Sequence, residues 1–514
     1  MKSLAVNLCI MQPAGYVYSL LFLDPARYLR YHLRRLGVDC TLTRNRLARD
    51  RVNIVFGAHV GFDRALAHRF CCVIFNTEQI GAGGAHLPEA YLDLLHNLPS
   101  LDYDPSNRDS YDSPLAGPVI PIMDAPFLRS GPPALPLAER PLDLLFFGVV
   151  NDRRANLLAA IESAGCQVTL FDKPLFGPER DQFIRQSKAV LNLHHYELAR
   201  FEQIRVAHCL SLGTPVISER TPATSPAAHF ENAVFFLPTD ELPRFVGQTF
   251  RSPGFYSDAK RMLRGFQSRD PLAHFGELVA YLQSVQRAWC AAPTTETTLR
   301  MCRMNLGSGK DYLAGWINVD INERANPDLV LDLSKPVQFP LTVPSATLGA
   351  LTLRAGCLET IYANNVLEHV SDLPALMTNG LTLLGDGGIF AIEVPYEGAR
   401  TAWQDPTHVR ALNENSWRYY TEWFWYLGWY THRFEIARFE YLDEHLAVCQ
   451  QPAAAFMRVL LRKVQTSLQE RMLARMIRPD FGPGFEDDWP PAAPTPAVQS
   501  PPGAACAAAD RLPA

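Results

Sequence analysis

Short apolar runs alternate along this chain with stretches whose apolar residues recur every three or four positions. In the first 130 residues the runs AVNLCIM, NIVFGAH and CCVIFNTE are separated by patterns such as PARYLRYHLRRLG, where Tyr28, Leu29, Leu33 and Leu36 recur at helix spacing. Alternation of strands with helices indicates a parallel sheet wrapped by helices. We therefore expect a first α/β unit over residues 1–135.

The same alternation resumes after a Pro/Gly-rich bridge, RSGPPALPLAERP. The runs LDLLFFGVVN, AVLNLHHYE and TPVISE predict strands, and LAHFGELVAYLQSVQRAW predicts a closing helix. This second unit is expected over residues 136–290, and two such sheets in tandem would form a cleft. A polar linker over residues 291–302 follows it.

A third α/β pattern covers residues 303–465. CRMNL and WINVD predict two strands, and further runs end at Asp332 and at Asn364-Asn365. After a helix, a Gly-rich turn and a fifth strand, HRFEIARFEYL and FMRVLLRKV predict two strands that close the sheet. A short basic helix is expected over 466–482, and the Pro/Ala-rich tail over 483–514 is expected to be disordered.

Composition narrows the range of partners and compartments. A net charge of −5 and a pI near 6.3 do not favour nucleic acid as a partner. The eleven cysteines lack metal or disulfide spacing, so we expect no metal ligands among them and a reducing compartment, the cytoplasm, while metal dependence stays open. The sequence contains no run of eighteen apolar residues, so we expect no membrane span. The basic helix could contact a membrane surface, with a solvated helix face as the alternative.

The glycine pair in MNLGSGKDYLAGWINVDI raises the question of a cofactor site. Gly307, Ser308 and Gly309 follow a predicted strand, and Asp320 ends the next one. A carboxylate at that position can accept hydrogen bonds from ribose hydroxyls. The alternative is a tight turn that uses glycine for positive φ and binds nothing.

Four predicted strands of this unit end in small, polar or acidic residues, at the glycine turn, at Asp320, at Asp332 and at Asn364-Asn365. By this pattern residues 303–465 resemble class I S-adenosylmethionine-dependent methyltransferases. The resemblance implies that Gly307, Ser308 and Gly309 lie against the methionine part of the cofactor and that Asp320 holds its ribose. It also implies that Asp332 lies by the adenine and that Asn364 and Asn365 line the site. The family pattern has an acid at Asn305 and a third glycine at Asp311. Because only eleven positions separate Gly309 from Asp320, the first helix must be truncated, as in sugar and cell-surface polysaccharide methyltransferases.

Methyl transfer to a hydroxyl needs an aligned nucleophile and a base. In WQDPTHVRALNENSW, His408 is the candidate base and Asp405 the residue that orients it or shares its task. The alternative is that both residues only cap the next helix by hydrogen bonds. His369 is a second candidate base, with a helix residue that packs beneath the cofactor as the alternative. The aromatic stretch 416–434 is either core or a sugar-stacking surface.

The first two units, with VLNLHHYELARFEQIRVAHCLSLGTPVISE, resemble the GT-B architecture of group 1 glycosyltransferases. The family's two donor-binding glutamates fall here at Arg200 and His208. Glu202 and Arg205 are neighbouring substitutes, with Arg205 pairing a diphosphate and Glu202 holding a hydroxyl; the alternative is an ion pair within one helix. Gly148 could receive phosphate, and Glu78 is a weaker catalytic or acceptor candidate.

The sequence therefore predicts tandem Rossmann-like units followed by a methyltransferase-like Rossmann unit. The predicted function is S-adenosylmethionine-dependent methylation of a glycan or glycan precursor, with a nucleotide sugar as a donor for the N-terminal half. One alternative makes that half a non-catalytic carbohydrate-binding module. Another makes the third unit a dinucleotide-dependent oxidoreductase, against which the incomplete GxGxxG motif argues.

Overall fold

The structure is a computed structural model that describes residues 3–13, 16–81, 84, 87–130, 134–171, 175–196, 198–291, 302–345 and 348–477. Most of the expected linker at 291–302, the end of the basic segment beyond 477 and the expected tail at 483–514 lie outside these residues. The chain divides into two compact units, and from here on the terms first unit and second unit refer to these two and not to the ranges expected from the sequence. The first comprises residues 1–332 and 338–354, and the second comprises 333–337 and the chain from 355 onward.

The first sheet has six parallel strands in the order β2-β1-β3-β4-β5-β6. Every residue of the third strand is buried, as expected for a parallel strand covered on both faces. The order reverses between β1 and β3, which is where such sheets bind ligands. The elements are β1 (Ala5–Ile10), η1 (Val17–Phe22), α1 (Leu23–Arg35), β2 (Asp39–Arg44), β3 (Val52–Phe56), β4 (Cys72–Phe75), α2 (Glu89–Asn97), β5 (Ser100–Asp102) and β6 (Ala116–Val119).

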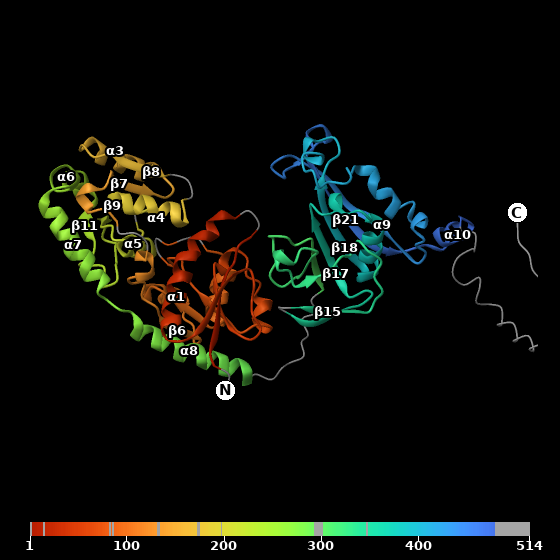
Figure 1. Cartoon of the computed structure of the whole chain (residues 1–514), viewed down its shortest axis with the longest axis horizontal. Helices are drawn as coiled ribbons and strands as arrows, with labels where there is room; N and C mark the ends of the chain where they lie inside the picture. The colour runs from red at the N-terminus through yellow and green to blue at the C-terminus, as the bar shows by residue number, and fades with distance from the viewer. Residues whose placement is uncertain are drawn as a thin grey trace, which may run out of the picture. The chain divides into compact units, whose positions relative to one another are not determined.

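The second sheet repeats this plan with five parallel strands in the order β11-β10-β9-β7-β8. Its order reverses between β7 and β9, and helices flank its strands (Figure 1). The elements are β7 (Leu142–Phe147), α3 (Asp152–Ser163), β8 (Val168–Phe171), α4 (Gly177–Gln186), β9 (Ser187–Asn192), α5 (Gln203–Ser211), β10 (Val216–Arg220), β11 (Phe235–Pro238), α6 (Leu242–Gln248), α7 (Pro253–Gln267) and α8 (Leu272–Ala291).

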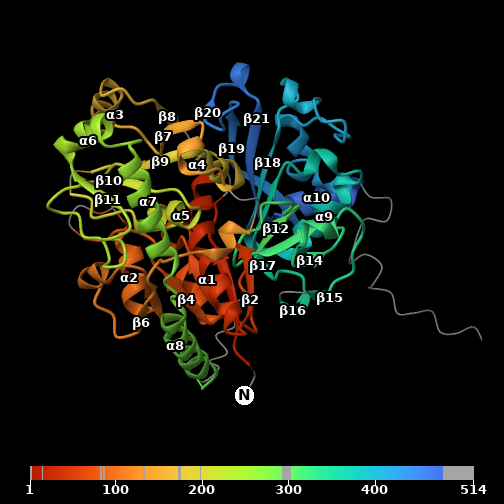
Figure 2. The ribbon, with the colours of Figure 1, turned by 60° about the vertical axis from the view of Figure 1, so that its left-hand side comes forward.

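The last of these helices, α8, packs against the first sheet and not the second. It lies beside β6 and α1 in both orientations (Figures 1 and 2). Phe275, Leu278 and Leu282 are fully buried in a core shared with the first sheet, and the Tyr281 hydroxyl donates to Leu115 O at 2.6 Å. Because α8 follows the second sheet in the chain but packs against the first, it joins the two Rossmann-like parts through one continuous core.

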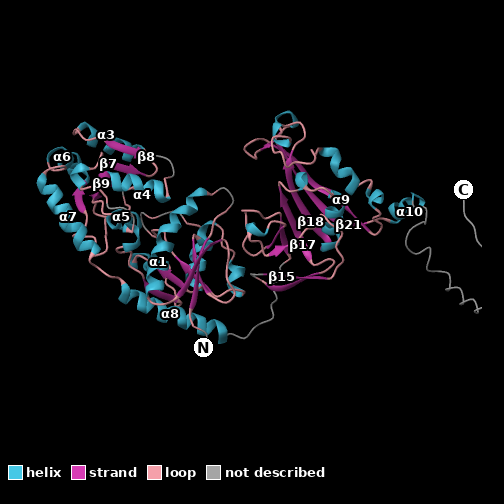
Figure 3. Cartoon of the chain, in the orientation of Figure 1, coloured by secondary structure: helices cyan, strands magenta, loops and turns pink. Residues whose placement is uncertain are grey.

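The third sheet has eight strands in the order β14-β13-β12-β17-β18-β21-β19-β20. The first five follow the doubly wound order 3-2-1-4-5, and β21 and β19 then run antiparallel. The predicted closing pair is therefore confirmed. Figure 3 shows β17, β18 and β21 of this sheet. The elements are β12 (Arg303–Leu306), β13 (Ile317–Asp320), β14 (Leu329–Val330), β17 (Leu358–Asn364), α9 (Leu373–Leu383), β18 (Leu384–Pro395), β19 (His432–Leu442), β20 (Val448–Cys449), β21 (Phe456–Gln465) and α10 (Leu468–Ile477); β15 (Leu341–Ser345) and β16 (Gly349–Leu353) form a separate hairpin.

These three sheets confirm the predicted fold class of tandem Rossmann-like units followed by a third. The aromatic stretch is mainly core, since Trp417, Tyr420 and Phe424 are buried, whereas Tyr419 and Tyr426 are exposed. Among the described residues, no helix combines the length and apolarity needed to cross a bilayer.

Candidate functional site

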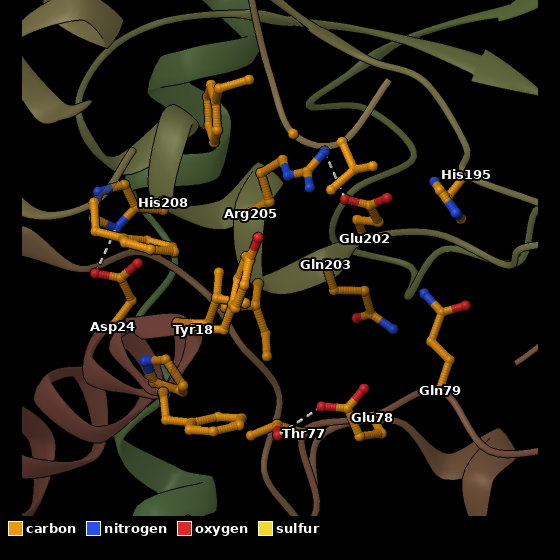
Figure 4. Close-up of a pocket in the computed structure, with 18 of the residues that line it drawn as sticks. Tyr18, Asp24, Thr77, Glu78, Gln79, His195, Glu202, Gln203, Arg205 and His208 are labelled. Carbon is orange, nitrogen blue, oxygen red and sulfur yellow. Dashed lines mark hydrogen bonds and ion pairs between the residues drawn. The ribbon is translucent and has the colours of Figure 1, made fainter. Parts of the chain in front are cut away.

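A cavity of about 530 Å³ lies in the first unit. Its wall combines segments that follow strands of the first sheet with segments that follow β7 and β9 and with the start of α5. Figure 4 shows polar side chains from these segments pointing into one space. The residues that line it include Tyr18, Asp24, His59, Glu78, Gln79, Gly148, Arg180, His195, Glu202, Arg205 and His208.

The three residues predicted to bind a sugar donor meet at this cavity. Gly148 follows β7 with φ of +140°, and the Arg205 guanidinium lies 3.4 Å from where a Cβ on Gly148 would be. Glu202 precedes α5, and one carboxylate oxygen lies 2.7 Å from Arg205 Nη1 (Figure 4). The other oxygen lies 3.2 Å from Arg154 Nη2. The predicted ion pair within the helix exists, and it forms part of the cavity wall. Their role in donor binding stays a prediction.

A buried charge cluster closes another side of the cavity. Arg180 lies 2.6 Å from Asp24 and 2.9 Å from Asp181, and His208 Nε2 lies 2.7 Å from Asp181 Oδ1. Burial alone would raise the pKa of Asp181, but the hydrogen bond from His208 and the Arg180 charge outweigh it and lower that pKa to about 2. At Asp24, burial would likewise raise the pKa, but the charges of His208 and Arg180 outweigh it and lower that pKa. The cluster therefore keeps both carboxylates ionised.

On the first-sheet side, Glu78 faces His59. Their closest atoms, Nε2 and Oε1, are 3.7 Å apart. Burial lowers the pKa of His59, although the Glu78 charge opposes this effect. A neutral imidazole and a carboxylate therefore line this end of the cavity, and the role of Glu78 as a catalytic or acceptor residue stays a prediction.

The two positions where the family has glutamates serve other purposes here. Arg200 donates from Nη1 to Ile80 O at 3.0 Å, and its backbone amide donates to Gln79 Oε1 at 3.1 Å. His208 belongs to the charge cluster. Arg200 thus ties the second sheet to the first, and only His208 of this pair lines the cavity.

In the third sheet, the glycine turn and Asp320 lie together. Gly307 and Gly309 have positive φ, +67° and +42°, and the Gly309 amide donates to Asp320 Oδ2 at 2.7 Å. The Asn322 amide donates to Asp320 Oδ1 at 2.7 Å. Ser308 is buried, and its hydroxyl has no hydrogen-bond partner. A buried unpartnered hydroxyl beside an exposed-backbone turn fits a polar ligand.

The connection from β12 to β13 contains no helix in its fully described span, residues 307–316. A buried network holds it instead. Asn305 Nδ2 donates to Asp311 O at 2.8 Å and to Asn318 Oδ1 at 3.0 Å. Asn318 Nδ2 and the Tyr312 hydroxyl both donate to Asp328. The methyltransferase pattern has an acid where this chain has Asn305. The asparagine has a physical reason, because a carboxylate there could not donate these hydrogen bonds.

The other predicted cofactor residues follow neighbouring strands. Asp332 lies two residues beyond β14 and is half-buried. Asn364 ends β17 and is exposed; Asn365 has φ of +51° and donates its amide to Glu393 O at 2.9 Å. Their contacts with a cofactor stay predictions.

The predicted base His408 lies against Glu368, with Nε2 and Oε1 4.0 Å apart. Asp405 accepts from the Thr407 amide and hydroxyl at 2.8 and 2.7 Å, and Thr407 in turn contacts His369 Nδ1 at 2.9 Å. Burial raises the pKa of Glu368 to about 7. Hydrogen bonds through Thr407 therefore link Asp405 to His369.

No protein-family model and no curated protein matches this chain. Among solved structures, AviGT4, a glycosyltransferase of avilamycin A biosynthesis, is 16% identical with a TM-score of 0.37, covering 55% of this chain and 98% of its own. Alr3699/HepE from Anabaena, solved with UDP and glucose, is 11% identical with a TM-score of 0.37, covering 55% and 100%. A methyltransferase dependent on S-adenosylmethionine from Archaeoglobus fulgidus is 14% identical with a TM-score of 0.22, covering 31% and 85%.

These likenesses concern the fold of parts of the chain. The matched structures include glycosyltransferases and methyltransferases dependent on S-adenosylmethionine. This is the two-part resemblance expected from the sequence. None of these matches assigns a ligand to a residue of this chain.

Sequence reasoning missed several residues of both regions. Asp24 and Arg180 lie 156 positions apart, and no local pattern links them. Glu368 was overlooked although it directly precedes His369, and an acid followed by histidine just after a predicted strand was a usable signal.

Proposed function

We propose that this protein is a glycan-modifying enzyme that transfers the methyl group of S-adenosylmethionine to a sugar hydroxyl. Its N-terminal half is proposed to bind a nucleotide sugar. The observation that carries the first part is an acid at the end of the second strand, bonded to the glycine turn after the first strand, with no helix between those strands.

That missing helix discriminates between nucleoside cofactors. A dinucleotide places its pyrophosphate on the amides at the start of the first crossover helix, and the third glycine of its fingerprint allows that helix to pack closely. In the dinucleotide fingerprint GxGxxG, counted from Gly307, the third glycine falls at Tyr312. Tyr312 is buried, and its hydroxyl donates to Asp328. The site therefore favours a nucleoside without phosphates and disfavours the oxidoreductase alternative.

The chain's residues fit such a cofactor. Asp320 is oriented by two backbone amides and is only partly buried, so its oxygens retain acceptor capacity for ribose hydroxyls. The unpartnered Ser308 hydroxyl can bond a polar group of the methionine part. S-adenosylmethionine would supply an electrophilic methyl group on its sulfonium, and the protein's task is to hold it beside an aligned hydroxyl.

Cofactor binding tests this assignment directly. Calorimetric titration of the full chain with S-adenosylmethionine should give one site, and Asp320→Ala should weaken it by about 10- to 100-fold, as expected for lost hydrogen bonds to a charged group. Asp311→Ala, which removes an exposed carboxylate from the same turn, should bind as wild type. Equal affinity in wild type and Asp320→Ala would refute the site, as would tighter binding of NAD.

The acceptor is tested with a labelled methyl donor and a panel of cell-surface glycan extracts. We expect label in methylated sugars after hydrolysis of the glycan. Cofactor binding together with label only in protein or amine acceptors would refute the sugar hydroxyl and leave the cofactor assignment intact.

The cavity of the first unit supports nucleotide-sugar binding. Arg205 is a cation at its wall, able to pair a diphosphate, and Glu202 beside it can accept from a hydroxyl. UDP and UDP-sugars are suitable ligands for the test. Arg205→Ala should weaken their binding by about tenfold or more, whereas Arg261→Ala, on the exposed face of α7, should not.

A turnover assay distinguishes a catalytic N-terminal half from a non-catalytic carbohydrate-binding one. Release of sugar from a nucleotide sugar, with transfer or hydrolysis, would support a glycosyltransferase. Carbohydrate binding without any nucleotide-sugar binding would support the non-catalytic module.

A further inference from the structure

Three side chains of the second unit bring metal-ligating atoms together. Glu368 and His369 lie in η9 (Leu367–His369), just after β17, and His408 lies in the loop that follows η10 (Arg400–Ala402). One ligand atom from each residue lies within 4.8 Å of the other two. The backbone joins the two loops, since the Val409 amide donates to Glu368 O at 2.9 Å.

The carboxylate of Glu368 lacks a partner. The residue is 2% exposed, and neither carboxylate oxygen has a hydrogen-bond partner. His408 Nε2, at 4.0 Å, is too far for a hydrogen bond. A buried carboxylate without compensation is costly, so its retention beside two imidazoles points to a cation.

The hydrogen bonds of both histidines leave a lone pair for such a cation. His408 Nδ1 lies 2.7 Å from Ala402 O, which can only accept, so in the neutral ring Nδ1 carries the proton and Nε2 keeps its lone pair. Thr407 donates its hydroxyl proton to Asp405, so it must accept from His369 Nδ1. Nε2 of each ring is therefore unprotonated when the ring is neutral, and each Nδ1–H is held by an oxygen, as in metal-bound histidines.

The spacing and ligand types also suit a metal. Bonds from zinc to nitrogen and oxygen are about 2.0–2.2 Å, so two ligands of one ion lie no more than roughly 4 Å apart. The 4.0 Å between Glu368 and His408 meets this limit, and a ring nitrogen of His369 lies within 4.8 Å of a ligand atom of each of them. Two imidazoles and one carboxylate suit zinc and other first-row transition ions, whereas magnesium prefers oxygen ligands.

We propose that Glu368, His369 and His408 bind one divalent transition-metal ion, with Thr407 and Asp405 as the outer shell that orients His369. Three protein ligands leave at least one coordination position open to water or a substrate oxygen. The expectation of no metal ligands rested on cysteine spacing, which does not report on a site built from histidine and glutamate. The proposal does not rest on the proposed function, because it concerns ion binding alone.

Metal binding by the full chain tests the site. After chelator treatment and dialysis, the protein is titrated with Zn²⁺, Co²⁺, Mn²⁺ and Mg²⁺ by calorimetry, and Co²⁺ is followed by its visible absorption. We expect one site that prefers Zn²⁺ and Co²⁺ over Mg²⁺, without the charge-transfer band of a cobalt–thiolate bond. Absence of any such site, or a thiolate spectrum, would overturn the proposal.

Variants locate the ion. Glu368→Gln and His408→Ala should each weaken binding by at least 10-fold, whereas His445→Ala, an exposed histidine elsewhere, should not. Thr407→Ala should weaken binding by about 10-fold or more and Thr407→Ser should restore it. Thr407 is exposed, so this pair keeps the test valid even if a ligand variant unfolds. Unchanged affinity in both Glu368→Gln and Thr407→Ala would overturn the assignment.

Discussion

At the residue scale, Asn305 shows how one side chain can replace a secondary-structure element. Its amide donates to the chain on both sides of the 307–316 connection, to Asp311 O and to Asn318 Oδ1. The family pattern has an acid at this position, and a helix spans the connection in the usual fold. Here the amide makes bonds that a carboxylate cannot make.

Asn305→Asp, which restores the family's residue, should therefore damage this protein. The buried carboxylate would face two oxygen acceptors, and we expect a loss of about 2–4 kcal/mol in stability together with weaker S-adenosylmethionine binding. Thermal unfolding and calorimetric titration measure the two effects. Asn322→Asp is the matched control, because Asn322 is exposed and its side chain acts as an acceptor, which aspartate also provides.

If Asn305→Asp bound the cofactor more tightly, the family's acid would be the functional group and Asn305 a replaceable substitute. That result would contradict the role given to the amide.

At the scale of elements, α1, α4 and α5 are joined by the charge cluster of Asp24, Arg180, Asp181 and His208. Arg180 and Asp181 come from α4, Asp24 from α1 and His208 from α5. The cluster sits in the wall of the cavity, and it couples the shape of that wall to the ionisation of two carboxylates.

Acid should weaken this junction. Asp181 has its pKa lowered to about 2 in the folded protein, so it binds its proton less readily there than in the unfolded chain. Its contribution to stability is complete above the unfolded value, near 4, and is lost as the pH falls toward 2. A shift of roughly two pKa units corresponds to about 2–3 kcal/mol.

Asp181→Asn should accordingly lower the unfolding temperature at pH 7, and its deficit relative to wild type should shrink as the pH falls from 4 to 3. Differential scanning calorimetry over this range measures the difference. Asp258→Asn, an exposed partner of Arg261 on α7, should differ little from wild type at every pH. A deficit for Asp181→Asn that does not change with pH would rule out the ionised carboxylate as its cause.

The elements themselves were largely predictable. WINVD ends at Asp320 as β13 does, and the two closing strands fall at β19 and β21, because apolar patterning is local. The packing of α8 on the first sheet was not predictable, since its amphipathic pattern fits either partner. Nor was the Asp24–Arg180 pair, which tertiary packing brings together from different elements, or the orientation of Asp405 toward Thr407.

At the scale of the whole molecule, the two proposed ligand sites of the chain lie on different sheets. The cavity of the first unit is built on the first and second sheets, whereas Gly307, Gly309 and Asp320 belong to the third. If each site binds its own ligand to the folded chain, each ligand stabilises the protein by mass action, by about 2.7 kcal/mol at 100 times its dissociation constant.

We expect these two stabilisations to be separable by mutation. Asp320→Ala should remove the rise in unfolding temperature caused by S-adenosylmethionine and retain the rise caused by UDP, and Arg205→Ala should do the reverse. The full chain and both variants are compared by thermal unfolding with each ligand alone and with both together. Loss of both responses in either variant would mean that the two ligands share a site or that one site depends on the other, because independent sites in one folded chain respond only to their own residues.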